Sequence, residues 1–201
     1  MKKIKTITVL LLLSLVLMLC SCGTVTTEQA SAYSDDIVQT ESAGDSSQKK
    51  APIDTEQQKI NRSQTGTCTL LIECSTILAN TEKLNKQKQD LVPEDGILYA
   101  EKEVTFYEGE SVFDVLQRET QDASIHMEFE WTPLYDSSYV SGIGNLYEFD
   151  CGELSGWTYS VNGWFPNYGA SRYIVSQGDK IEWHYTCDLG KDVGAEMGKG
   201  K

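Results

Sequence analysis

The sequence contains few groups that could act as a base near neutral pH, because its only histidines are His126 and His184. Hydrolases with a serine or cysteine nucleophile need such a base beside that nucleophile. The chain also lacks a Gly-x-Ser-x-Gly turn, a His-Glu-x-x-His helix, a phosphate-binding glycine loop and a calcium-binding loop. We therefore expect a protein that is not an enzyme.

Basic residues are scarce as well, with 17 Lys and Arg against 30 Asp and Glu and a net charge of -13. Such a surface repels nucleic acid and anionic lipid. We exclude nucleic acid as a partner and do not expect the folded part to dock on a membrane by itself. Alternatively, the excess of acidic residues serves only to keep the protein soluble.

Long apolar runs are absent except near the start, where residues 9–19 follow a basic stretch and are broken only by Ser14. This run is shorter than the roughly 20 residues of a spanning helix and is typical of a signal peptide. It ends in Leu19-Cys20-Ser21-Cys22, which resembles a bacterial lipobox. We expect cleavage after residue 21 and acylation of Cys22 with fatty acids that include palmitate. The lipid would hold the protein on the extracellular face of the cell membrane. The alternative is a secreted protein without lipid.

The rest of the chain divides by composition. Residues 22–65 are polar and predict a disordered, lipid-attached linker. Residues 66–194 hold every Trp and Phe and nearly every Tyr, which predicts one compact domain. Residues 195–201 predict a flexible tail.

Periodicity within the domain predicts an α+β fold, a mixed sheet packed on one main helix. The main helix is expected over 111–121, where the Ser111 hydroxyl caps an apolar stripe. A second helix is expected over 77–89, and Asn162-Gly163 predicts a hairpin turn. Strands are expected at 67–74, 104–107, 125–131, 146–149, 157–161 and 181–185.

Four cysteines remain after removal of the signal peptide and acylation of Cys22, namely Cys68, Cys74, Cys151 and Cys187. An even number outside the cytoplasm predicts two disulfides. On one strand Cys68 and Cys74 would lie about 20 Å apart, too far to bond to each other. Each must then pair with Cys151 or Cys187, and both connectivities stay open. A zinc site is the alternative, although the spacing contains no Cys-x-x-Cys pair.

An aromatic cluster around the predicted hairpin is the best candidate for a ligand surface, because large rings with polar tips suit ligand faces. Core packing is the alternative for its members. A separate pair, Glu128 and Glu130 on one strand face, has a spacing that glycosidases use, but such strand carboxylates are usually solvated. The predicted ligand-binding residues are Tyr159, Asn162, Trp164, Phe165, Tyr168 and Tyr173.

Three segments carry a family resemblance: Gly-Trp-Thr-Tyr-Ser-Val-Asn-Gly-Trp-Phe-Pro-Asn-Tyr-Gly-Ala-Ser-Arg-Tyr at 156–173, Gly-Asp-Lys-Ile-Glu-Trp at 178–183 and Glu-Gly-Glu-Ser-Val-Phe-Asp-Val-Leu at 108–116. Together with the first strand they resemble the bacterial transcobalamin-like C-terminal domain family. The resemblance implies a β-grasp-like sheet around one helix, similar to the smaller domain of animal cobalamin carriers.

In those carriers this domain closes over a corrinoid held by a larger helical domain. The resemblance therefore implies cobalamin or another corrinoid as ligand, with no resident cofactor. Residues before 66 are too few and too polar to form the helical domain, so a helical partner would come from another chain. A cell-envelope protein-interaction or adhesion module is the second hypothesis.

The resemblance also bears on the cysteines. A sheet of this kind with its first and last strands adjacent and parallel would bring Cys74 near Cys187. Cys68 would then be left for Cys151.

Overall fold

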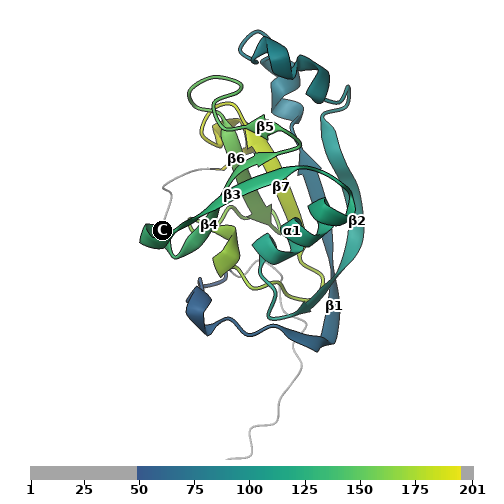
Figure 1. Ribbon diagram of the computed structural model, residues 1–201, viewed down its shortest axis with the longest axis vertical. Coiled ribbons are helices and arrows are strands. Elements are labelled where there is room, and N and C mark those ends of the chain that lie inside the picture. The colour runs from purple at the N-terminus through teal and green to yellow at the C-terminus, as the bar shows by residue number, and fades with distance from the viewer. Residues whose placement is uncertain (1–48, 196–201) are drawn as a thin grey trace, which may run out of the picture. The chain divides into compact units, whose positions relative to one another are not determined.

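The central element is a four-stranded mixed sheet with the order β2-β1-β7-β6, seen in a computed structural model that describes residues 49–195 (Figure 1). Its strands are β1 (Asn61–Glu73), β2 (Ile97–Glu108), β6 (Gly156–Val161) and β7 (Lys180–Thr186). β1 and β7 are parallel neighbours, whereas β2 and β6 pair antiparallel at the two edges. The adjacent, parallel first and last strands confirm what the family resemblance implied.

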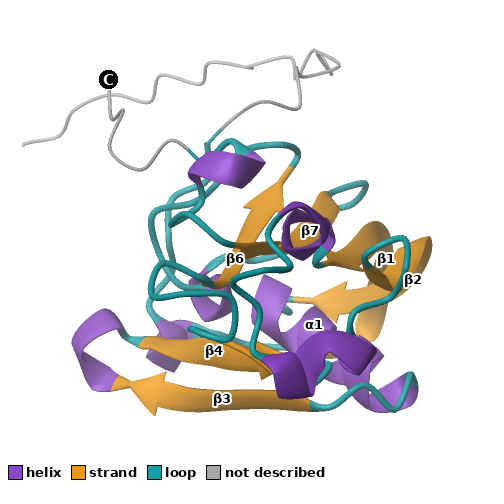
Figure 2. Ribbon diagram, turned by 90° about the horizontal axis from the view of Figure 1, so that it is seen from above, coloured by secondary structure: helices purple, strands orange, loops and turns teal. Residues whose placement is uncertain are grey.

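A second sheet contains β3 (Met127–Thr132), β4 (Ser137–Ile143) and β5 (Leu146–Tyr147), all antiparallel. Helix α1 (Val112–Asp122) lies between the β3–β4 ribbon and the strands β1 and β2 (Figure 2). The predicted α+β fold with one main helix is therefore confirmed. Short 3-10 helices complete the fold: η1 (Thr55–Gln57), η2 (Ser75–Ala79), η3 (Lys86–Leu91), η4 (Pro133–Tyr135), η5 (Ala170–Arg172) and η6 (Lys191–Val193).

Helix α1 begins where the sequence predicted. The Ser111 hydroxyl accepts from the Asp114 amide at 3.2 Å, and the Ser111 amide donates to the Asp114 carboxylate at 2.8 Å. This reciprocal pair is a capping box and satisfies two amides that the helix itself leaves free. The buried stripe of α1 then closes the main core against the sheet; its members are Val112, Phe113, Val115 and Leu116.

A second, smaller core lies at the other end of the β1–β7 pair, beneath the loops that follow β5 and β7. The side chains that form it are Cys74, Ile77, Leu84, Leu146, Cys151, Tyr185 and Cys187. Tyr185 is fully buried, and its hydroxyl donates to the Tyr147 carbonyl at 2.7 Å. This core therefore supports the loops on both sides of it.

Three sequence-based boundaries are wrong. Residues 77–89 form no α-helix, because Asn80 and Asn85 bond their side chains to nearby backbone groups and favour η2 and η3 instead. The strand expected at 146–149 ends at Tyr147. The strand expected at 104–107 is the end of the much longer β2.

The first strand, β1, begins at Asn61, before the predicted domain start at residue 66, and the chain before it packs on the domain. The Ile53 amide donates to the Arg172 carbonyl at 3.0 Å, and Nε of Arg172 donates back to the Ile53 carbonyl at 2.7 Å. The Thr55 amide donates to the Asp136 carboxylate at 3.0 Å. We call residues 50–58 the N-terminal strap.

The predicted signal peptide 1–21, the lipidation residue Cys22, most of the predicted linker and residues 196–201 of the predicted tail lie outside the described residues. Within residues 49–195, no helix has the length and apolar character needed to cross a bilayer.

Candidate functional site

Four of the six predicted ligand-binding residues come together in one aromatic cluster, formed by Tyr159, Trp164, Tyr168 and Tyr173. The Trp164 ring lies 6.1 Å from the Tyr168 ring and 6.4 Å from the Tyr173 ring, centroid to centroid. The Tyr159 hydroxyl donates to the Tyr168 carbonyl at 2.9 Å. Tyr159 and Tyr173 are buried in the main core, so little of either ring is available to a ligand.

One residue of the N-terminal strap, Lys50, lies against this aromatic cluster. The Lys50 ammonium lies 5.1 Å from the centroid of the Tyr173 ring and donates to the Ser176 hydroxyl at 2.7 Å. The Tyr168 hydroxyl donates to the Lys50 carbonyl. Lys50 therefore lies against two of the tyrosines that the sequence predicted as ligand-binding residues.

Asn162 and Phe165 lie apart from that cluster. Asn162 and Gly163 both have positive φ, 55° and 75°, and form the predicted two-residue turn between Val161 and Trp164. The Asn162 amide nitrogen donates to Asp179 at 2.9 Å, and its oxygen accepts from the Lys180 amide at 2.9 Å. Phe165 packs against His184 with ring centroids 5.6 Å apart. Asn162 therefore joins the turn to the start of β7.

A more open surface lies above the second core, as a cavity of about 310 Å³ between β4, the loop 148–156 and the loop 186–195. Four large apolar side chains line it and remain exposed to solvent, Tyr139, Phe149, Leu154 and Leu189, and Trp157 forms part of its wall. We call this surface the apolar groove. Single exposed apolar residues are ordinary on a protein, but a contiguous group marks a binding surface.

Two of these apolar residues have strained backbones. Phe149 has φ 67° with 63% of its surface exposed, and Leu189 has φ 49° with 49% exposed. This left-handed conformation costs about 1–2 kcal/mol for a residue with a branched or bulky side chain. Neither residue recovers that energy by burial. Backbone strain of this kind gathers at functional sites, where the surrounding structure maintains it.

Hydrogen bonds hold both loops of the apolar groove in place. The Phe149 amide donates to the Ser155 carbonyl at 3.0 Å, and the Leu189 amide donates to the Leu154 carbonyl at 2.9 Å, so the two loops are directly joined. The Gly190 amide donates to the Thr186 hydroxyl at 2.7 Å. The backbone segments that carry the exposed apolar side chains are thus held by hydrogen bonds.

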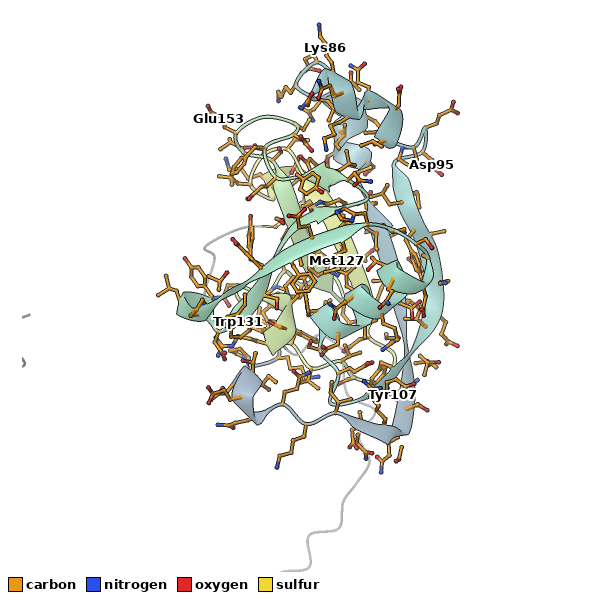
Figure 3. The ribbon with its side chains drawn as sticks, viewed as in Figure 1. Lys86, Asp95, Tyr107, Met127, Trp131 and Glu153 are labelled. Atoms are coloured by element: carbon orange, nitrogen blue, oxygen red, sulfur yellow. The ribbon has the colours of Figure 1, made fainter. Side chains whose placement is uncertain are left out.

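Carboxylates at the edge of the apolar groove determine its electrostatic character. Glu148 and Glu153 both line it, and Glu153 lies in the loop that Figure 3 labels. The Tyr139 hydroxyl donates to Glu148; burial first, and then this bond, raise the pKa of Tyr139. The groove therefore combines apolar walls with hydrogen-bond acceptors and favours neutral or cationic ligands that carry N–H groups.

Two other cavities, of about 440 and 320 Å³, lie where the N-terminal strap and residues 64–66 approach Gly109 and Ile174. Their walls are mostly polar side chains and backbone, and the largest apolar side chain among them, Phe106, is buried in the main core. They lack the exposed apolar surface that makes the apolar groove a candidate.

The two histidines differ in their surroundings. His126 is exposed, and its Nε2 lies 3.1 Å from the Tyr147 hydroxyl. Nδ1 of His184 lies 2.6 Å from Glu73, and its Nε2 lies 3.4 Å from the Ser160 hydroxyl, an order of groups that resembles a hydrolase triad. Ser160 is only 1% exposed and also bonds Glu182 at 3.3 Å. A substrate could not reach that hydroxyl, so this network has the character of a structural one.

The four cysteines of the domain are free thiols in the structure and all are buried. The pairs Cys74–Cys187 and Cys68–Cys151 are not formed. Cys68 packs in the main core, whereas Cys151 lies in the second core with Cys74 and Cys187. Among residues 49–195, no group of three or more His, Cys, Asp or Glu side chains is arranged to hold a metal ion.

The sequence analysis did not single out the residues of the apolar groove. Phe149 was assigned to a strand, where a large apolar residue is expected to be buried. A signal was nevertheless present, because Leu154 and Leu189 each stand alone among Gly, Ser, Asp and Glu in turn-rich segments. An apolar residue within such a segment has no periodic partner to pack with and is therefore a candidate for exposure.

Comparison with known proteins gives one family match, to a domain of unknown function (DUF4430), over residues 109–187. That span includes β3 to β7, Phe149 and both Cys151 and Cys187. No curated protein matches the sequence.

Two solved structures are similar. Haptocorrin in complex with Cbi has a TM-score of 0.46 and 14% identity, over 65% of this chain and 27% of the haptocorrin chain. A protein from Ruminococcus gnavus ATCC 29149, described as a candidate metal binding protein, has a TM-score of 0.36 and 15% identity, over 60% of this chain and 96% of that one. This chain thus spans about a quarter of haptocorrin, and neither similarity identifies a ligand.

Proposed function

We propose that this protein is a lipid-anchored binding protein of the extracellular membrane face whose domain binds a small molecule in the apolar groove. The observation that carries the proposal is the pair Phe149 and Leu189, two exposed apolar residues with left-handed backbones that line one cavity. Stability alone would favour glycine at both positions. A ligand that covers these side chains gives them a function that offsets the strain.

A corrinoid is the first candidate ligand, because the sequence resembles the transcobalamin-like family. The cavity of about 310 Å³ is at the small end of ligand pockets and could cover only one side of so large a molecule. A second protein, such as a helical domain on another chain, would be needed to enclose it. We therefore expect affinity in the micromolar range or weaker for this chain alone.

Calorimetric titration of the full-length protein with cobinamide, cyanocobalamin and cobyrinic acid tests the proposal. The amide-bearing corrinoids should bind at least tenfold more tightly than cobyrinic acid, whose carboxylates would approach Glu148 and Glu153. Phe149→Ala and Leu189→Ala should each weaken binding at least tenfold. Leu134→Ala is the matched control, because Leu134 is 83% exposed but does not line the groove. If no heat of binding is detected at millimolar ligand concentration, a corrinoid is excluded as the ligand.

The absence of catalysis is part of the proposal. The arrangement Glu73–His184–Ser160 has the order of a triad, but the serine is buried and shares its hydroxyl with Glu182. Hydrolysis of activated esters that disappeared in Ser160→Ala would contradict this part. Metabolic labelling with a fatty acid tests the anchor, and Cys22→Ala should abolish the label.

A second function, a protein-interaction module, is favoured by the end of the β3–β4 hairpin. Trp131 lies toward the end of β3, whereas Met127 lies at its start (Figure 3), and Trp131 is 52% exposed. Leu134 and Tyr135 follow it and are more exposed still. A photo-crosslinking residue at Leu134 should capture a partner in intact cells if this surface is used, while the same residue at Lys86 serves as the control.

A further inference from the structure

Each of the two loops that form the apolar groove carries a buried cysteine close in sequence to its exposed apolar residue. Cys151 comes two residues after Phe149, and Cys187 comes two residues before Leu189. Both side chains turn inward, opposite to the exposed apolar ones, and are buried in the second core. The pair therefore lies where the two loops leave the folded interior.

Both sulfur atoms face the same short segment of backbone. Sγ of Cys151 lies 3.4 Å from the Asn80 carbonyl oxygen, and Sγ of Cys187 lies 3.6 Å from the Thr76 hydroxyl. Thr76 and Asn80 are themselves joined, because the Asn80 amide nitrogen donates to the Thr76 carbonyl at 2.9 Å. Cys151 and Cys187 belong to the same buried cluster, and Cys187 is near enough to Cys151 to help raise the pKa of its thiol.

The other pairings fit less well. β1 and β7 pair Glu73 with His184, so Cys187 would lie two residues beyond the position opposite Cys74. Two residues along a strand and one strand spacing give about 8 Å between the Cα atoms, beyond the usual limit of about 7 Å. Cys68 lies opposite Val104 in the main core, roughly 20 Å along β1 from Cys74.

We propose that Cys151 and Cys187 form a disulfide in the native protein, which ties together the two loops that carry Phe149 and Leu189. The oxidant would be a disulfide, either of a small thiol or of an oxidoreductase outside the cytoplasm. One cysteine thiolate attacks it, which releases one thiol and leaves a mixed disulfide. The second cysteine thiolate then attacks the first cysteine's sulfur and releases the other thiol. Two protein protons are lost, and the oxidant takes up the two electrons.

The bond would form before folding is complete. Burial, and then contact with Cys187, raise the pKa of Cys151 to about 12, so the folded protein contains almost no Cys151 thiolate at neutral pH. Thiolate is the reactive form in exchange. Once the protein is folded, Cys68 and Cys74, whose pKa values burial also raises to about 12, contain almost no thiolate and should persist as thiols.

Differential alkylation of the full-length protein from cell membranes tests the bond. Free thiols are blocked in denaturant without reductant, and the sample is then reduced and labelled with an isotopically heavy reagent. We expect the light label on Cys68 and Cys74 and the heavy label on Cys151 and Cys187. Cys187→Ser should convert Cys151 to the light label, whereas Cys74→Ser should leave the pattern at 151 and 187 unchanged. Light label on all four, or a linked peptide that contains Cys74 or Cys68, would overturn the proposal.

The consequence for the apolar groove rests on the proposed function, whereas the bond itself does not. Hydrogen exchange separates the two, because reduction should speed amide exchange at Phe149 and Leu189 at least tenfold and leave α1 unchanged. Equal exchange with and without reductant would show that the bond does not tie the loops. Loss of corrinoid binding alone would affect only the proposed function.

Discussion

Phe149 and Leu189 belong to loops that are distant in the sequence, yet they line one cavity and share an unusual backbone conformation, with φ of 67° and 49°. The Leu189 amide donates to the Leu154 carbonyl, so the loops hold each other in this arrangement. The proposed ligand binding gives both strained residues a role at this exposed surface that packing does not give them. The first prediction separates stability from binding there.

Phe149→Gly should unfold at a higher denaturant concentration than Phe149→Ala, with a difference of about 1 kcal/mol in the free energy of unfolding. Glycine adopts positive φ without a steric penalty, and alanine does not. Both variants should lose ligand binding to the same extent, because both lack the ring. Guanidinium denaturation followed by circular dichroism measures the first quantity.

Glycine and alanine at Lys86, an exposed position outside the left-handed residues, provide the matched control. At this position the alanine variant should be at least as stable as the glycine variant. Equal stability of Phe149→Gly and Phe149→Ala would mean that the backbone at 149 is not strained.

Arg172→Ala should loosen the N-terminal strap and destabilise the protein by about 1–3 kcal/mol, because a charged hydrogen-bond donor is lost. The Arg172 side chain donates to the Ile53 carbonyl and lies 3.8 Å from Asp136. Limited proteolysis should then cut within residues 50–58 at an increased rate. Lys59→Ala, an exposed change next to the strap, should leave the rate unchanged.

That experiment also examines the aromatic cluster that the sequence predicted as a ligand surface. If corrinoid binding increases in Arg172→Ala, release of the strap has uncovered Tyr168 and Tyr173. Unchanged binding would leave the apolar groove as the better candidate.

The sequence predicted those parts of the fold whose local signals agree with their packing. Ser111 with the following apolar stripe marks α1, and alternating residues mark β6 and β7. It failed at 77–89, where side chains of Asn80 and Asn85 compete for backbone groups, and at the strap, which is held by hydrogen bonds to Arg172 rather than by apolar burial.

The candidate site was harder to predict than the fold. The aromatic residues at 157–173 have the composition of a ligand surface, but Tyr159 and Tyr173 are buried in the main core and Lys50 lies against Tyr168 and Tyr173. Composition carries no information about either contact. The sequence could not identify Phe149 as a site residue, because its positive φ, rather than its residue type, distinguishes it from a strand residue. Contacts distant in the sequence decide both cases.

Ser111→Ala should reduce the free energy of unfolding by about 1–2 kcal/mol, since the hydroxyl that accepts from the Asp114 amide is lost from a fully buried helix start. Chemical denaturation at constant pH measures the change. Gln117→Ala, on the exposed side of the same helix, should stay within about 0.5 kcal/mol of wild type. A similar loss in both variants would indicate that helix propensity rather than the cap is responsible.

Glu73→Gln should make stability less dependent on pH in the acid range. The hydrogen bond from His184, and then that from Ser75, lower the pKa of Glu73 below the usual value of about 4.3. The stability from this carboxylate is therefore fully present above that usual value and is lost as the pH falls through the lower, folded-state value. Denaturation free energies at pH 7 and pH 3 should differ less in Glu73→Gln than in wild type, while Glu128→Gln, exposed on β3, should behave as wild type.

Reduction of the proposed Cys151–Cys187 bond should lower the free energy of unfolding by about 3–5 kcal/mol. The length of the loop that the bond closes lies between about 15 and about 100 residues, and the chain-entropy estimates for those two lengths set this range. The double variant Cys151→Ser/Cys187→Ser should match reduced wild type within about 1 kcal/mol and should no longer respond to reductant. Cys68→Ser provides the contrast, since it disturbs the main core but should still respond to reductant. A reductant response that persists in the double variant would show that the stabilising effect does not come from a Cys151–Cys187 bond, and the loops of the apolar groove would then be held by hydrogen bonds alone.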